Sequence, residues 1–120
     1  MTLRRLLLIP AAALLLGAPA AAAKHATPKL TGEVGPGYTI ELGLAGKHVK
    51  TRRAGTYTVK VEDKSSSHNF HLTGPALNKS TTVGFVGETT WTVKLRKGTY
   101  RFQCDPHAAF GMKGSFRVTG

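Results

Sequence analysis

Hydrophobic and polar residues alternate with a period of two along most of the chain after Leu30. The clearest alternating runs are residues 57–61, 91–95, 100–104 and 116–118. Side chains of a strand point alternately to its two faces, and aromatic and β-branched residues are typical of strands that bury one face. We therefore predict a strand at each of these runs. The aromatic residues that they place in the predicted core include Tyr57, Trp91, Tyr100 and Phe102.

Shorter runs at Tyr38–Leu42 and Phe70–Leu72 predict two further strands, and glycine, proline and serine clusters separate the runs as turns. The Lys97-Gly98 break is short enough to join its neighbouring strands as a hairpin. No segment after residue 23 keeps a helical period. Many short strands separated by turns predict an all-β fold, an antiparallel β-sandwich.

The first 23 residues have a different pattern. A basic start with Arg4 and Arg5 precedes an apolar run at 6–16, and small residues at 17–23 form an A-x-A-like cleavage site. This order is typical of a cleaved secretory signal peptide, and the apolar run is short for a membrane span. We expect residues 1–23 to be removed, 24–29 to form a flexible lead-in, and 30–120 to form one domain. The protein would then be periplasmic or extracellular, with no integral membrane segment.

Cys104 is the only cysteine of the chain, so no intramolecular disulfide can form. Exported domains of this size often contain disulfides, and a free thiol in an oxidising compartment is prone to oxidation. Cys104 is therefore either buried and inert or held as a thiolate by a metal.

Positive charge dominates the expected mature chain. Without Arg4 and Arg5, 15 of the 17 Lys and Arg residues remain against 6 Asp and Glu residues, a net charge of about +9. Such a surplus favours anionic partners. An exported protein rarely meets nucleic acid, so we expect a monomer that contacts acidic redox proteins, and anionic lipid or cell-wall polymers as further candidates. Solvated charge without a specific partner is the alternative.

The segment Cys104–Met112 carries the candidate chemistry. Cys104, His107 and Met112 follow a predicted strand with the spacing C-x2-H-x4-M. Thiolate, imidazole and thioether ligands together select copper over magnesium, calcium or manganese. A trigonal copper site needs a second imidazole from another part of the chain.

Two histidines could supply that imidazole, His68 and His71. In strand alternation His68 shares a face with Phe70 and Leu72, which would point inward, whereas His71 would point outward. We therefore favour His68 and expect His71 to be a surface histidine.

These residues resemble the cupredoxins. His68-Asn69 with the downstream Cys104-x2-His107-x4-Met112 is similar, in loop spacing, to the plastocyanin and pseudoazurin members of that family. The resemblance implies a Greek-key β-sandwich and one type 1 copper ion that carries single electrons. It implies His68, Cys104 and His107 as strong ligands, Met112 as the long axial ligand, and Asn69 as the residue that ties the two ligand loops together. The apolar patch through which electrons would pass around His107 is Pro106, Ala108, Ala109 and Phe110.

Other functions are less consistent with the sequence. An envelope protein that delivers copper without redox turnover could use the same ligands, and it is the main alternative. An enzyme is not expected, because the chain is short and Asp105 stands where multicopper oxidases carry a histidine. A metal-free adhesion domain is favoured only by the net charge, and the strict alternation of the aromatic residues favours a core over a nucleic-acid stacking surface.

Overall fold

The computed structural model describes Gly17 and residues 26–120. The expected signal peptide, apart from Gly17, and the first residues of the lead-in lie outside the described residues. Within the described part of the chain, no helix has the length and apolar character needed to cross a membrane.

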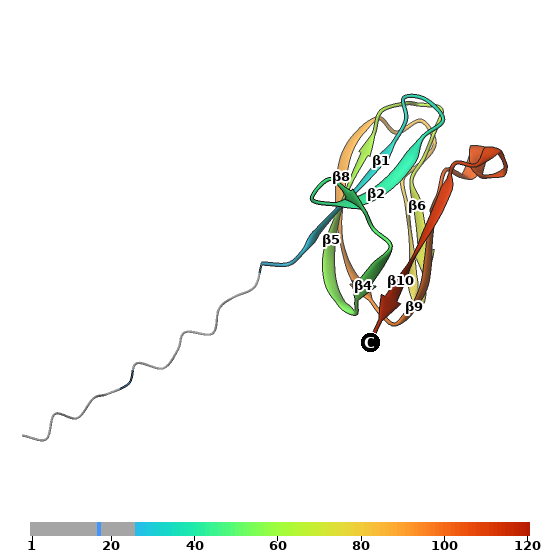
Figure 1. Cartoon of the computed structure of the whole chain (residues 1–120). Helices are drawn as coiled ribbons and strands as arrows, with labels where there is room; N and C mark the ends of the chain where they lie inside the picture. The colour runs from blue at the N-terminus through green and yellow to red at the C-terminus, as the bar shows by residue number, and fades with distance from the viewer. Residues whose placement is uncertain (1–16, 18–25) are drawn as a thin grey trace, which may run out of the picture.

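In the described part of the chain, ten strands and one short 3-10 helix build a two-layer sandwich (Figure 1). The strands are β1 (Lys29–Val34), β2 (Ile40–Leu44), β3 (Lys47–His48), β4 (Thr51–Arg53), β5 (Gly55–Asp63), β6 (His71–Gly74), β7 (Leu77–Ser80), β8 (Gly87–Leu95), β9 (Gly98–Gln103) and β10 (Lys113–Thr119), and the helix is η1 (Asp105–Phe110). The first sheet has the order β3-β2-β1-β5-β8 and the second sheet the order β4-β10-β9-β6-β7. The all-β sandwich predicted from the sequence is confirmed. Two pairs, β1 with β5 and β4 with β10, are parallel, so the sheets are not purely antiparallel.

The alternating runs 57–61, 91–95 and 116–118 lie within β5, β8 and β10. The run 100–104 lies within β9 except for Cys104, which follows the end of that strand. The predicted hairpin at Lys97-Gly98 is wrong. β8 pairs with β5 in the first sheet, whereas β9 pairs with β6 and β10 in the second, so this connection crosses between the layers.

Tyr100 stabilises the turn in which the chain crosses from β8 to β9. Its hydroxyl accepts a hydrogen bond from the N–H of Arg96 (2.8 Å) and donates to the carbonyl of Arg96 (2.9 Å). The turn is thereby held by a buried side chain from the next strand, which sequence spacing does not reveal. The strands β1, β3, β4 and β7 were not predicted. Two to four residues give no clear period in β3, β4 and β7, and in β1 the inward position between Leu30 and Val34 is a glycine, Gly32, which interrupts the alternation.

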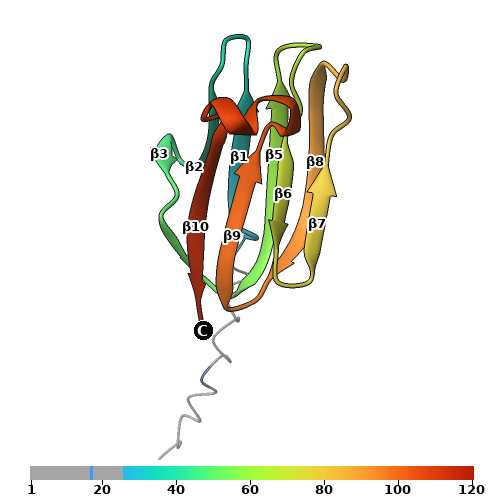
Figure 2. The same cartoon turned by 90° about the vertical axis from the view of Figure 1, so that its right-hand side faces the viewer.

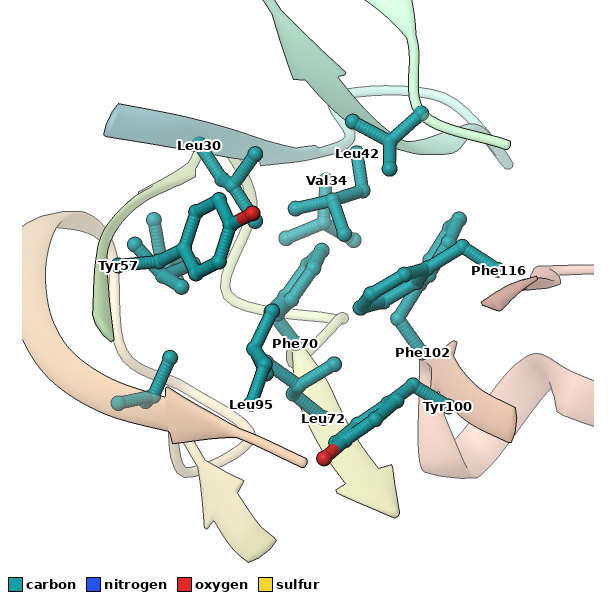
Figure 3. Close-up of a cluster of buried hydrophobic side chains, with 14 of the residues drawn as sticks. Leu30, Val34, Leu42, Tyr57, Phe70, Leu72, Leu95, Tyr100, Phe102 and Phe116 are labelled. Carbon is teal, nitrogen blue, oxygen red and sulfur yellow. The ribbon is translucent and has the colours of Figure 1, made fainter. Parts of the chain in front are cut away.

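The core lies between the two sheets, where every second residue points inward (Figure 3). Phe70 stacks on Phe102 with ring centroids 5.9 Å apart, and Tyr100 stacks on Phe116 at 5.2 Å. Tyr57, Tyr100 and Phe102 are buried as predicted. Trp91 is half-buried at the edge of the same cluster.

One end of the sandwich collects the segments that carry the candidate chemistry. The loop after β1, the loop after β5, the loop after β7 and η1 all lie at this end, at the top of Figure 2. Residues more than 60 positions apart in sequence, such as Tyr38 and His107, therefore meet there.

Candidate metal centre

Three side chains meet at this end through their metal-binding atoms. The Nδ1 atoms of His68 and His107 lie 3.0 Å apart, and the Sγ atom of Cys104 lies 3.6 Å from the first and 3.5 Å from the second. His68 and Cys104 are buried, whereas His107 is half-buried. The structure therefore brings His68, and not His71, to Cys104 and His107.

The loop Cys104–Met112 is closed on itself by backbone hydrogen bonds. The N–H of Cys104 donates to the carbonyl of Met112 (3.0 Å), and the N–H of Met112 donates to the carbonyl of His107 (3.3 Å). Pro106 lies in the first turn of η1, directly after Asp105, where the backbone N–H that proline lacks would have no partner within the helix. Gly111 ends the helix with a φ of 94°, a conformation that glycine adopts without steric cost. Sequence thus specifies a tight, self-supporting loop.

The segment before β6 positions His68. Its N–H donates to the carbonyl of Ser65 (3.3 Å), and the carboxylate of Asp63 accepts the N–H of Ser65 (3.1 Å). Burial raises the pKa of the Asp63 carboxyl, and this hydrogen bond and the charge of His68 oppose that rise only in part. The turn that leads to His68 is therefore anchored on a buried acid at the end of β5.

The donor set fits a copper ion. The three atoms are 3.0 to 3.6 Å apart, so the point equidistant from them lies about 2 Å from each. This distance is the length of a metal–nitrogen bond. Two imidazoles and one thiolate in a trigonal arrangement are typical of a blue-copper site. Met112 is buried where the same loop joins β10, and its role as an axial ligand stays a prediction.

Asn69 connects the two loops that carry His68 and Cys104. Its Nδ2 donates to Oδ2 of Asp105 (2.8 Å) and to the carbonyl of Thr81 (3.3 Å), and its Oδ1 accepts the N–H of Asp105 (2.7 Å). The residues that directly follow the two candidate ligands are therefore bound to each other.

His71, which we expected to be a surface histidine, is half-buried and bound through both of its ring nitrogens. Its Nδ1 lies 2.9 Å from Oδ1 of Asp105, and its Nε2 lies 2.6 Å from Oδ1 of Asn78. Burial lowers the pKa of His71, but the hydrogen bonds to Asn78 and Asp105 and the charge of Asp105 more than compensate and raise it above 6.5. Asp105 is also partly desolvated, and its bonds to Gln103, Asn69 and His71 hold its pKa below 3.8. An ion pair thus extends the Asn69 network away from the metal centre.

Tyr38 is a residue of the centre that sequence reasoning missed. Its ring packs edge-on against His107 (centroids 4.9 Å apart) and His68 (5.6 Å), although 70% of the residue is exposed. The alternating pattern placed Tyr38 in a strand, whereas β2 begins only at Ile40. Its position after the turn residues Gly35-Pro36-Gly37 was the available signal.

The predicted apolar patch around His107 is accessible. Pro106, Ala109 and Phe110 are exposed and Ala108 is half-buried. Among the residues that the structure describes, Phe110 is the most exposed large hydrophobic residue at 78%, and its ring centroid lies 6.3 Å from that of His107. With Tyr38, these side chains form an apolar rim around the His107 ring.

Comparison with known proteins identifies the family. Residues 39–119 match the model of copper binding proteins of the plastocyanin/azurin family. The chain belongs to this family. Copper is therefore the cofactor of this cupredoxin, and its His68, Cys104 and His107 cluster fits a single type 1 copper ion.

Individual relatives agree with the family. The chain is 52% identical to plastocyanin of Daucus carota over 33 residues, which are 28% of this chain and 34% of the relative, and 53% identical to plastocyanin A/B of Petroselinum crispum over 32 residues, which are 27% and 33%. It thus matches about a third of the length of these plastocyanins.

Solved structures show the same fold. Auracyanin of Roseiflexus castenholzii is similar with a TM-score of 0.57 at 24% identity, covering 80% of this chain and 100% of that one. Rusticyanin of Thiobacillus ferrooxidans has a TM-score of 0.54 at 25% identity and 76% coverage of each chain.

Proposed function

We propose that this cupredoxin is an exported blue-copper protein that shuttles single electrons between redox partners and catalyses no reaction of its own. The observation that carries the proposal is the triangle of two imidazole nitrogens and one thiolate sulfur, held between two loops at one end of a closed sandwich.

In this proposal His68, Cys104 and His107 hold the ion and Met112 is the weak axial ligand. Bound copper supplies one-electron chemistry between Cu(I) and Cu(II). The chain keeps the ligands in one arrangement, because Cys104 and Met112 are joined through their backbones and Asn69 ties the loop of His68 to that of Cys104. Fixed ligands reduce the rearrangement that accompanies a change of charge.

The half-buried His107 gives the centre its route to the surface. The rings of Tyr38 and Phe110 lie beside its ring, and Pro106, Ala108 and Ala109 complete the apolar rim. A partner that packs on this rim would exclude water and come close to the ligand without displacing it. The signal peptide expected at residues 1–23 supports export, since a cleaved chain would begin shortly before β1.

The test is the spectrum of the copper(II)-loaded protein. We expect an intense visible band from thiolate-to-copper charge transfer and narrow copper hyperfine splitting in paramagnetic resonance. Cys104→Ser should abolish the band. His68→Ala should also abolish it, whereas the matched variant His71→Ala should keep it.

A pale, ordinary copper spectrum in the wild type would contradict the type 1 centre. Reversible voltammetry then separates an electron carrier from a copper-delivery protein: the carrier keeps its copper through repeated reduction and oxidation. Loss of copper on reduction would show delivery instead.

A further inference from the structure

The two outer faces of the sandwich differ in charge. The first sheet presents Glu33, Glu41, Glu62 and Glu88 on its outer face, which are all the glutamates of the chain. The Nζ atom of Lys60 lies 3.0 Å from Glu62 and 3.3 Å from Glu88, and that of Lys64 lies 3.8 Å from Glu33. Positive and negative charges are therefore mixed on this side.

The second sheet has an outer face without such compensation. Its exposed cations are Arg53 on β4, Arg101 on β9, and Lys113 and Arg117 on β10. Of the two aspartates of the chain, Asp63 is buried and Asp105 lies at the rim, where His71, Asn69 and Gln103 already bind its carboxylate. Four exposed cations thus lie together on this face with no glutamate among them.

The strand register gathers these cations into a band. Arg101 lies opposite Ser115, with Lys113 and Arg117 as its diagonal neighbours on β10. Arg117 lies opposite Thr51 on β4, and Arg53 is two residues further along that strand. Diagonal neighbours on one face of a sheet are within reach of long side chains, and like charges at such positions repel. An anionic partner would relieve this repulsion.

A groove of about 480 Å³ connects the band with the metal end of the molecule. Arg101 and Lys113 line it from the strands, and Ala108 and Ala109 line it from η1. Figure 2 shows η1 lying across the upper ends of β9 and β10. Ala109 also belongs to the apolar rim, so the groove and the surroundings of His107 form one continuous surface.

We propose that the outer face of the second sheet, centred on Arg101, is the docking surface for an acidic partner protein. Carboxylates of the partner pair with Arg101, Lys113 and Arg117, and arginine binds carboxylates in a bidentate manner. A lipid surface fits less well, because the sheet face itself carries Ser, Thr and Gln between its cations, and apolar side chains adjoin it only at the end where η1 lies. That docking serves electron transfer depends on the proposed function. The binding of acidic groups to this face does not depend on it.

The experiment titrates an octaglutamate peptide into the isotope-labelled protein at low salt, both copper-free and loaded with copper(I), and follows the backbone amides by nuclear magnetic resonance. We expect the shifts to concentrate on β9, β10 and η1. Arg101→Glu should weaken binding of the peptide by about tenfold, and Lys113→Glu should weaken it to a similar extent. The matched control is Lys94→Glu, an exposed cation on the first sheet with the same change of charge, which should alter binding by less than about twofold.

Three results would overturn the proposal: an equal loss in Lys94→Glu, shifts centred on the first sheet, or inorganic phosphate binding as tightly as the peptide at the same amides. Tighter binding to phosphatidylglycerol vesicles than to the peptide would replace the protein partner with a membrane. Peptide binding by the copper-free protein together with a failed spectral test would remove the carrier function and leave the docking surface. A protein that has the blue-copper spectrum but does not bind the peptide would keep the carrier function and remove the docking surface.

Discussion

Asn69 and Asp105 exchange two hydrogen bonds, one in each direction: the amide of Asn69 donates to the Asp105 carboxylate (2.8 Å), and the backbone N–H of Asp105 donates to the Asn69 carbonyl oxygen (2.7 Å). These residues follow His68 and Cys104, so the exchange sets the distance between the two ligand loops. Asn69 is buried, which makes an unpaired partner costly.

Asn69→Ala should lower the free energy of unfolding of the copper-free protein by about 2 kcal/mol, because it leaves buried donors and acceptors without partners. It should also shift the reduction potential of the copper-loaded protein. Chemical denaturation and voltammetry measure the two effects. The control Asn78→Ala removes an exposed partner of His71 and should cost less than about 1 kcal/mol. Equal losses in both variants would contradict a specific role for Asn69.

The His71–Asp105 pair should make stability depend on pH. The folded state raises the pKa of His71 above 6.5, so the stabilisation is complete below pH 6.5 and is lost as pH rises through the folded value. Asp105 has its pKa lowered below 3.8, so its contribution is present above that pH and is lost as pH falls through the lower folded value.

Unfolding of the copper-free wild type and of His71→Gln should therefore differ most between these limits and converge at high pH. A titration of the His71 ring by nuclear magnetic resonance locates the upper limit. His48→Gln, on the exposed strand β3, is the control. A constant difference between wild type and His71→Gln from pH 5 to pH 9 would show that the ion pair does not contribute as described.

Gly111→Ala should destabilise the loop that carries the ligands. Gly111 has a φ of 94° with open space around its Cβ position, so the cost is backbone strain alone, about 1 to 2 kcal/mol. Gly37→Ala, also in open space but without a positive φ, should be nearly neutral. Thermal unfolding of the copper-free proteins compares them. Indistinguishable unfolding temperatures would refute the strain argument.

Tyr38→Ala should open the metal centre to solvent, because the ring covers both histidines. We expect a chelator to remove copper several times faster from this variant than from wild type. Tyr38→Phe should behave like the wild type, since the ring and not the hydroxyl makes the contact. An unchanged rate of copper removal in Tyr38→Ala would show that the Tyr38 ring does not shield the metal centre from solvent.

Local pattern was sufficient for several parts of this molecule. The period of two identified the long strands. A strand that buries one face alternates hydrophobic and polar residues, and this pattern does not depend on which strand it pairs with. The loop Cys104–Met112 could be recognised because its ligand types, its proline and its glycine all lie within nine residues. His68 was distinguished from His71 by the side-chain direction expected in a strand and by the resemblance of His68-Asn69 to the cupredoxins.

Long-range packing decided the rest. β8 and β9 are adjacent in sequence yet belong to different sheets, because β8 pairs with β5 whereas β9 pairs with β6 and β10. Tyr100 of β9 binds the backbone of Arg96 in the turn between them. Tyr38 reaches the ligand histidines only because the loop after β1 lies at the same end as η1. Asp105 joins Asn69 and His71 from a position more than 30 residues away.

The sequence by itself determined that the chain is an all-β copper-binding protein, since alternation and ligand spacing are local properties. Only the tertiary structure decided where the positive charge lies. Arg53, Arg101 and Arg117 share one face because three strands pair in a particular register, and the glutamates share the other for the same reason. Net charge is a sum over residues, whereas a charged surface depends on which strands are neighbours.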